Sequence, residues 1–265
     1  DLHYPLRRQR QMCISDRLQR VLNKELPKDL KSKIDDLADK IIDGKEKLAT
    51  RKSSANALEL LCSQLPEMIG GSADLTGSVL TKTSGAQAIN ANDFSGSYIH
   101  YGVREHAMGA IMNGLALHSN FIPFAGTFLV FADYLKPAIR LSALMEQQVI
   151  YVFTHDSIGL GEDGPTHQPI EHVAMLRAIP NLNVFRPADA LETLKCYEVA
   201  LNSKKTPSAI ILTRQGLPYI ERSKDQSEFG AYIVSEEENP DTIIYASGSE
   251  VEVALNTKEK LKSAN

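Results

Sequence analysis

The chain has 265 residues, 43% hydrophobic and 23% charged, which is the composition of an ordinary globular protein. The net charge of -4 gives no electrostatic reason to expect a nucleic-acid or membrane partner. No apolar run is long enough to span a bilayer, and residues 1–10 lack the apolar segment of a signal peptide. The cysteines Cys13, Cys62 and Cys196 lie far apart and are odd in number. They favour a reducing compartment, so we expect a cytoplasmic protein.

Residues 16–49 are polar with helically spaced apolar positions interrupted at Pro27, and we interpret residues 1–50 as a helical linker. From residue 51 to residue 222, strand and helix patterns alternate. This alternation predicts βαβ units in an α/β domain, with a parallel sheet covered by helices on both faces. The predicted strands are 67–71, 98–103, 122–125, 149–154, 184–185 and 209–213, and the predicted helices are 54–64, 105–117, 128–145, 170–178 and 190–201.

A polar stretch at 216–226 separates this domain from the last part of the chain. Strand patterns at 231–234 and 242–246 are followed by a helical pattern at 250–261. We therefore expect residues 229–265 to begin a second α/β unit. The unit is incomplete because no returning strand follows to cover the helix.

Two carboxylates stand where predicted strands end. Glu105 begins a helix directly after a strand-like segment, and Asp74 follows a Gly-Gly turn. Taken alone, the first is explained by the helix dipole and the second by a turn or cap. We nevertheless expect Glu105 at the carboxyl edge of the parallel sheet, which is where α/β proteins bind ligands.

The segment 159–164 formally matches the dinucleotide pattern GxGxxG after a strand. We reject that interpretation because Glu162 and Asp163 would repel a pyrophosphate and Pro165 removes an amide that should bind it. A loop that presents Asp163 and His167 to a hydroxylated substrate is the better interpretation. His155 and His167 are twelve residues apart without a nearby cysteine, so zinc spacing is absent.

Four aromatic residues recur at helical spacing, namely Phe124, Phe128, Phe131 and Tyr134. Such a stripe is typical of a core, and its position after a strand and the turn at 126–127 also allows a cofactor platform. Arg51 begins the first helix of the domain and Arg214 ends its last strand. Each guanidinium is suited to a phosphate, and each is also an ordinary surface residue.

In combination, these motifs closely resemble transketolase from about residue 16 to the end of the chain. The 154–169 block is the most specific, and the match corresponds to the pyrimidine-binding domain of a thiamine-diphosphate enzyme plus the start of the third domain. The matching segments are GSADLTGS at 71–78, YIHYGVREHAM at 98–108, FAGTFLVFADY at 124–134, THDSIGLGEDGPTHQP at 154–169 and LTRQ at 212–215.

The resemblance implies cofactor roles for five residues. Glu105 matches the glutamate that hydrogen-bonds N1′ of the aminopyrimidine and stabilises its imino tautomer, whose nitrogen takes the C2 proton of the thiazolium. Phe128, Phe131 and Tyr134 match the aromatic pocket of the pyrimidine ring. Asp74 matches a cofactor-side aspartate near the subunit contact.

The resemblance implies substrate roles for another group. The residues that match the cluster binding the phosphate end of the sugar are Arg51, Ser78, His155 and Arg214. Asp163 and His167 match residues that bind the hydroxyls and the carbonyl end of the substrate. His167 also matches a group that transfers protons.

The family holds the diphosphate and a divalent cation such as Mg²⁺ on another domain, which begins with Gly-Asp-Gly. That tripeptide is absent here. We therefore expect this chain to carry half of a site, without metal ligands of its own. It would be inactive alone, and it would work as a homodimer or with a partner chain that carries the diphosphate-binding domain.

The expected function is transketolase activity in the pentose phosphate pathway, with sugar phosphates as substrates. This reaction reversibly transfers a two-carbon ketol unit from a ketose phosphate to an aldose phosphate. Sister enzymes of the deoxyxylulose-phosphate and dihydroxyacetone synthase types are alternatives. A non-catalytic partner module is an alternative from another class, and an NAD-binding domain is the weakest candidate.

Overall fold

The computed structural model describes residues 14–222 and 226–264. Within this part, six strands form one sheet in the order β3-β2-β4-β5-β7-β6, and every neighbouring pair is parallel. The predicted α/β sheet is thereby confirmed. The strands are β2 (Met68–Ser72), β3 (Tyr98–His100), β4 (Ile122–Phe128), β5 (Ile150–Thr154), β6 (Asn183–Phe185) and β7 (Ser208–Ile211).

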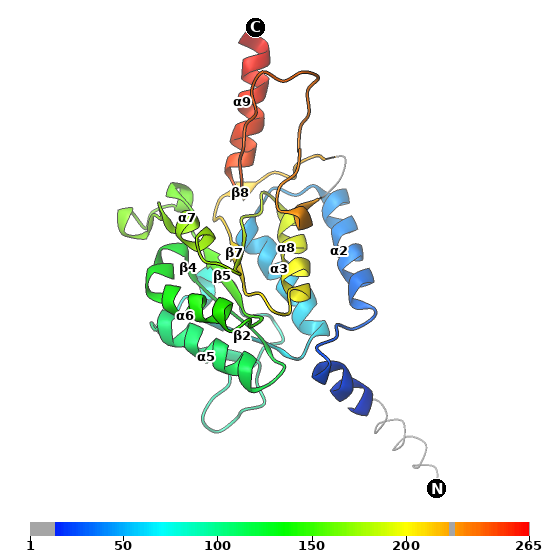
Figure 1. Ribbon diagram of the computed structural model, residues 1–265, viewed down its shortest axis with the longest axis vertical. Coiled ribbons are helices and arrows are strands. Elements are labelled where there is room, and N and C mark those ends of the chain that lie inside the picture. The colour runs from blue at the N-terminus through cyan, green and yellow to red at the C-terminus, as the bar shows by residue number, and fades with distance from the viewer. Residues whose placement is uncertain (1–13, 223–225, 265) are drawn as a thin grey trace.

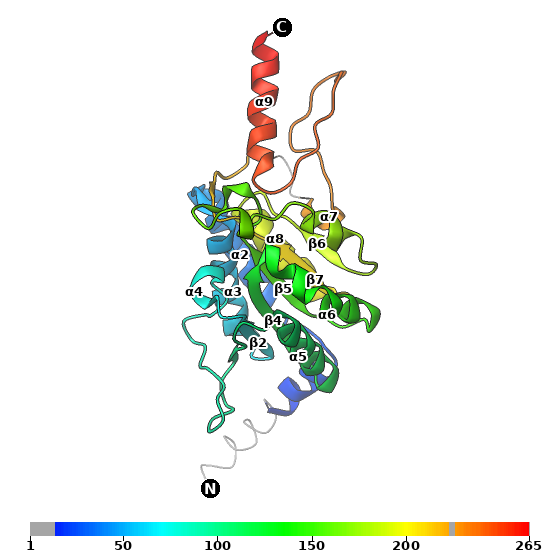
Figure 2. The ribbon, with the colours of Figure 1, turned by 90° about the vertical axis from the view of Figure 1, so that its left-hand side faces the viewer.

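Helices cover both faces of the sheet (Figures 1 and 2). One face carries α5 (Glu105–His118), α6 (Ala132–Leu144) and α7 (His172–Arg177), and the other carries α2 (Leu30–Gly44), α3 (Thr50–Gln64) and α8 (Ala190–Asn202). The remaining short helices lie in connections. They are α4 (Thr76–Val79), η1 (Leu129–Phe131), η2 (Ile158–Leu160), η3 (Pro165–His167) and η4 (Ser227–Phe229).

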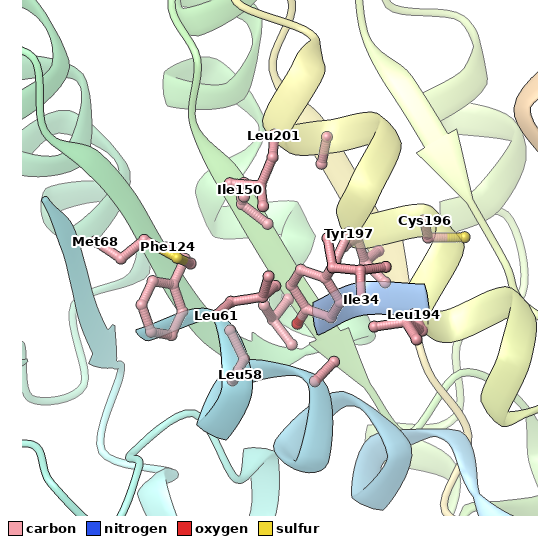
Figure 3. Packing of buried hydrophobic residues seen from close by; sticks show 14 of the residues in the cluster. Ile34, Leu58, Leu61, Met68, Phe124, Ile150, Leu194, Cys196, Tyr197 and Leu201 are labelled. Atoms are coloured by element: carbon pink, nitrogen blue, oxygen red, sulfur yellow. The ribbon is translucent and has the colours of Figure 1, made fainter. Parts of the chain in front are cut away.

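The central strands are buried along their whole length because helices pack on each side of them. On the α3 and α8 face, Leu58, Leu61 and Tyr197 pack over Phe124 and Ile150 (Figure 3). Burying a side chain of this size stabilises the fold by about 1.5–3 kcal/mol. The hydroxyl of Tyr197 lies 2.7 Å from that of Ser54, so this buried polar group is satisfied.

On the opposite face, α5 and α6 join through a buried polar network. Ser142 lies at its centre, 2.5 Å from Oδ1 of Asn113 and 2.6 Å from the hydroxyl of Tyr151. Asn113 also donates to the carbonyl oxygen of Ala138. Because each buried group has a partner, the network fixes the position of α6 over β5.

The helix predicted over 128–145 begins later than expected. Phe128 is the last residue of β4, and the α-helical part starts at Ala132. The parallel pairing of Phe128 with Thr154 on β5 extends the strand beyond the point that local pattern suggested. Phe124 and Phe128 therefore lie on a strand, and the predicted helical stripe of four aromatic residues is wrong.

A second small sheet was not predicted. β1 (Leu48–Ala49) pairs antiparallel with β8 (Gly216–Leu217), across more than 160 residues of chain. Two-residue strands lack a periodic pattern, so only the tertiary contact defines them. This pairing brings the start of α3 next to the segment that follows β7.

Of the second α/β unit predicted at 229–265, the described residues show the helix and neither strand. The helix predicted at 250–261 is confirmed as α9 (Glu250–Ala264), which projects away from the sheet (Figures 1 and 2). The strands predicted at 231–234 and 242–246 are wrong, because neither segment has strand structure. A strand needs a neighbour for its backbone groups, and no partner strand lies beside these segments in the described residues.

The segment before the domain is helical on either side of Pro27, as predicted, with one helix over residues 14–22 and α2 beyond it. Leu30, Ile34 and Ala38 of α2 are buried in the core on the α8 side. Cys13 and residues 1–10, which carried part of the sequence argument, lie outside the described residues. Among the described helices, none has the length and apolar character needed to cross a membrane.

Two glycines of α5 provide a test of the α5–α6 packing. A Cβ on Gly109 would lie 2.6 Å from Cδ1 of Leu135 and 2.7 Å from Cβ of Ala138, whereas a Cβ on Gly114 would meet nothing within 4 Å. We expect Gly114→Ala to raise the free energy of unfolding by up to about 1 kcal/mol through helix propensity. We expect Gly109→Ala to lower it by about 1–3 kcal/mol through overpacking.

Urea unfolding of the two variants beside the wild type measures both effects. Equal stabilisation by the two substitutions would contradict the close packing of α6 against Gly109.

Candidate active site

The predicted site residues gather at one edge of the sheet, because all six strands point the same way. Phe128 ends β4, His155 directly follows β5, and Arg214 follows β7. Arg51 joins them from α3, whose backbone N–H at Arg51 donates to the carbonyl oxygen of Thr213 at 3.3 Å. We call the following residues the edge cluster: Arg51, Phe128, Phe131, His155, Asp163, His167 and Arg214.

Aromatic and imidazole rings form one side of the edge cluster. The ring of Phe128 lies 5.8 Å from that of Phe131 in a stacked arrangement and 3.8 Å from the imidazole of His155. His167 approaches Phe128 and Phe131 edge-on, at 6.0 Å and 5.5 Å between ring centroids. Tyr134 extends the group at 6.2 Å from Phe131 and is itself 63% exposed. The rings form an apolar group with two imidazoles in contact with it.

His155 is the most constrained residue of the edge cluster. Its side chain is only 2% exposed, and its Nδ1 lies 2.8 Å from the hydroxyl of Thr154. Its backbone has φ of 60°, a left-handed conformation that non-glycine residues rarely adopt. Burial, followed by the positive charge of Arg51, lowers the pKa of His155 to about 4. The imidazole is therefore neutral near pH 7.

The charged side of the edge cluster has two arginines and one carboxylate. Arg51 Nη1 donates to the carbonyl oxygen of Ser78 at 2.9 Å, while its Nε is buried without a hydrogen-bond partner. Arg214 donates to the carbonyl oxygen of Leu160 at 2.8 Å and lies 3.4 Å from the Asp163 carboxylate. Burial and the neighbouring Arg214 both lower the pKa of Arg51. The surplus positive charge and the free donor suit an anion.

The glycines of the 159–164 loop allow it to approach the arginine. Gly161 has φ of 113°, and a Cβ there would lie 2.4 Å from Nη1 of Arg214. A Cβ on Gly159 would overlap the side chain of Gln215. The glycine pattern therefore serves close contact between this loop and residues 214–215, which agrees with the rejection of a dinucleotide loop.

Glu105 and Asp74 lie at the same sheet edge, outside the network of contacts described above. Glu105 is the first residue of α5 and is 8% exposed, and its carboxylate makes no hydrogen bond or ion pair to the described residues. Asp74 is exposed and has φ of 63° just after β2. A carboxylate at this edge that has no ion pair with the described residues is available to a ligand.

The edge cluster is distinct from the hollows at the amino edge of the sheet. One hollow lies between residues 21–26 and the starts of β4 and β5, and another lies beside residues 145–147 and 204–205. Neither contains a predicted site residue. The predicted site residues therefore lie at the carboxyl edge, away from both hollows.

One buried ion pair beside the cluster was not predicted. Arg186, which follows β6, donates through Nε and Nη2 to the carboxylate of Asp156 at 3.0 Å and 2.8 Å. Its Nη1 donates to the carbonyl oxygen of Ser247 and also contacts Glu250 of α9. Its position after a predicted strand was the available signal. Arg186 connects the residue next to His155 with the C-terminal segment.

Comparison with known proteins gives one consistent family. The family described as "Transketolase, pyrimidine binding domain" matches residues 46–219. The transketolase of Sinorhizobium medicae is 59% identical over 221 residues, which are 82% of this chain and 32% of that protein. The transketolase of Aquifex aeolicus is 49% identical over 94% of this chain and 36% of its own length. The chain thus spans about a third of the curated relatives that it matches.

Solved structures agree with this result. Transketolase from Pichia stipitis in complex with sedoheptulose 7-phosphate has a TM-score of 0.88 and 43% identity, covering 97% of this chain and 38% of that chain. A structure described as "Split gene transketolase, inactive beta4 tetramer" has a TM-score of 0.65 and 30% identity. It covers 82% of this chain and 68% of that chain.

The lowered pKa of His155 has a measurable consequence. The folded state binds this proton more weakly than the unfolded chain, so His155 contributes stability above the unfolded pKa near 6.5 that is lost as pH falls towards 4. We expect Arg51→Gln to raise the pKa of His155 and Asp163→Asn to lower it further. Arg140→Gln, on the far part of α6, is the matched control and should change nothing.

Histidine NMR titration of the four proteins checks these directions. An unchanged His155 pKa in Arg51→Gln would show that the charge of Arg51 does not contribute to the shift.

Proposed function

The chain belongs to the transketolase family, and from this premise we propose that it contributes the pyrimidine-binding part of a thiamine-diphosphate-dependent transketolase. That enzyme reversibly transfers a two-carbon ketol unit from a ketose phosphate to an aldose phosphate. The main support is the edge cluster, where neutral imidazole, two arginines and stacked aromatic rings meet at the carboxyl edge of a parallel sheet.

The cofactor end of the proposed site has two components. The buried, unpartnered carboxylate of Glu105 would hold a proton at N1′ of the aminopyrimidine. Phe128, Phe131 and Tyr134 would stack on the pyrimidine ring, and Asp74 would lie at the cofactor side of the subunit contact. When bound, thiamine diphosphate supplies the carbanion-stabilising thiazolium ring. Residues of this chain orient it and exclude water.

The substrate end follows from the charges. Arg51, Arg214, His155 and the Ser78 segment would bind the phosphate, since guanidinium groups make bidentate bonds to phosphate oxygens. Asp163, on the loop held by Arg214, would accept hydrogen bonds from sugar hydroxyls. His167 would act at the carbonyl end of the sugar, where an imidazole can give or take a proton.

The other half of the site would come from a second polypeptide segment. We propose that it holds the diphosphate and a divalent cation, as part of a homodimer or of a partner chain. The split-gene relative, described as an inactive beta4 tetramer, supports the expectation that this chain is inactive alone. We propose a division into a 1–50 helical segment, whose α2 packs on the domain that follows, a 51–222 pyrimidine-binding domain and a 229–265 C-terminal unit. We also propose that the enzyme is cytoplasmic and belongs to the pentose phosphate pathway.

Replacing the proposed proton-holding group tests the function directly. In the complete assembly with thiamine diphosphate and Mg²⁺, we expect Glu105→Gln to lower kcat by about 10²–10⁴-fold, the range of general acid–base catalysis. Glu238→Gln, at an exposed position, is the matched control and should retain full activity. The measurement is product formation from a ketose phosphate donor and an aldose phosphate acceptor.

Near-normal turnover by Glu105→Gln would refute the proposed acid role. If the wild-type assembly forms no product from this donor and acceptor, a sister synthase activity becomes the better assignment.

Phe128, Phe131 and Tyr134, which we call the aromatic platform, can be tested separately from Glu105. Phe131→Ala removes one face of the stack, and stacking contributes about 0.5–1.5 kcal/mol per pair, so we expect cofactor affinity to fall by about two- to tenfold. Phe94→Ala removes a phenylalanine that is 77% exposed and should leave affinity unchanged. Titration of thiamine diphosphate into the assembly gives both values, and equal affinities would assign Phe131 to packing.

A further inference from the structure

A group of metal-ligand side chains lies between α6 and α7, apart from the edge cluster. It consists of Asp133 in the first turn of α6, Glu171 at the N-cap of α7 and His172, the first residue of α7. One donor atom from each of the three residues lies within 4.8 Å of the other two. None of these three residues is assigned a role in ketol transfer, so this group is independent of the proposed function.

His172 is the unusual member of this group. Its side chain is 4% exposed, and both ring nitrogens are buried without a hydrogen-bond partner. Buried ring nitrogens normally have a hydrogen-bond partner, so this imidazole is an exception among buried polar groups. Carboxylate oxygens lie near both ring nitrogens: Oδ1 of Asp133 is 3.2 Å from Nε2, and Oε2 of Glu171 is 3.9 Å from Nδ1. The histidine therefore faces two acidic groups rather than hydrogen-bond donors.

The spacing is that of ligands around a cation. Nε2 of His172 lies 3.2 Å from Oδ1 of Asp133, although the geometry is not that of a hydrogen bond. Two ligands of a tetrahedral zinc ion, each about 2.0–2.1 Å from the metal, lie about 3.4 Å apart. The Glu171 carboxylate is 70% exposed and free to turn towards the same point. Water from the open side would complete the coordination.

We propose that Asp133, Glu171 and His172 form a binding site for a divalent transition-metal ion such as Zn²⁺. The imidazole nitrogen shifts the preference of this ligand set towards Zn²⁺ or Co²⁺, whereas Mg²⁺ prefers oxygen ligands and keeps its waters. The bound ion would tie α6 to α7. Tyr134 follows Asp133 in the chain, and the loop that carries His167 leads into α7. The ion would therefore also help to fix the positions of Tyr134 and His167.

The test is titration of the full 265-residue chain with Zn²⁺ by calorimetry in the presence of excess Mg²⁺, together with the visible absorption of added Co²⁺. We expect one ion per chain and a Co²⁺ spectrum typical of a low-coordinate site. Asp133→Asn and His172→Gln should each weaken binding by at least about tenfold, the loss that even outer ligand partners typically cause. His118→Gln, at the exposed end of α5, is the matched control.

Because His172 is buried, His172→Gln needs a check of folding by circular dichroism. The double variant Asp133→Asn with Glu171→Gln changes only exposed side chains and decides the matter if His172→Gln does not fold. Zinc affinity that is the same in the wild type and the double variant, or no binding by the wild type, would overturn the proposal.

Discussion

Parallel pairing of buried strands is the constraint on which this molecule depends. β4, β5 and β7 lie side by side under helices on both faces, so their backbone groups are satisfied within the sheet and their side chains in the core. All strands then end at one edge. Phe128, His155 and Arg214, which are widely separated in the chain, meet there without any special connection between them.

The side chains of the edge cluster carry more positive than negative charge, which suits an anion. Two guanidinium groups and a buried imidazole face a single carboxylate, Asp163, which lies on a glycine-containing loop. The surplus of positive charge is held in place by backbone carbonyl groups of Ser78 and Leu160. Donors fixed in this way would lose little conformational freedom on binding an anion such as the phosphate of the proposed substrate.

The site is also connected to the rest of the chain through side chains that take no part in it. Arg186 joins Asp156, the residue after His155, to Ser247 and the start of α9. Between α6 and α7, Nε2 of His172 lies 3.2 Å from the carboxylate of Asp133, the residue before Tyr134. The segments that carry His155 and Tyr134 thus each contact a further part of the structure.

The sequence by itself predicted the alternation of strands and helices and the parallel sheet, because apolar runs and polar turns are local patterns. It also named the candidate residues that follow the strands, and parallel strands end at one edge. Tertiary structure decided what depends on distant partners. Phe128 became a strand residue through pairing with Thr154, and β1 and β8 exist only through each other. The predicted strands near residues 231 and 242 lack such a partner in the described residues. The buried imidazole of His172 likewise becomes notable only when folding places it between two carboxylates.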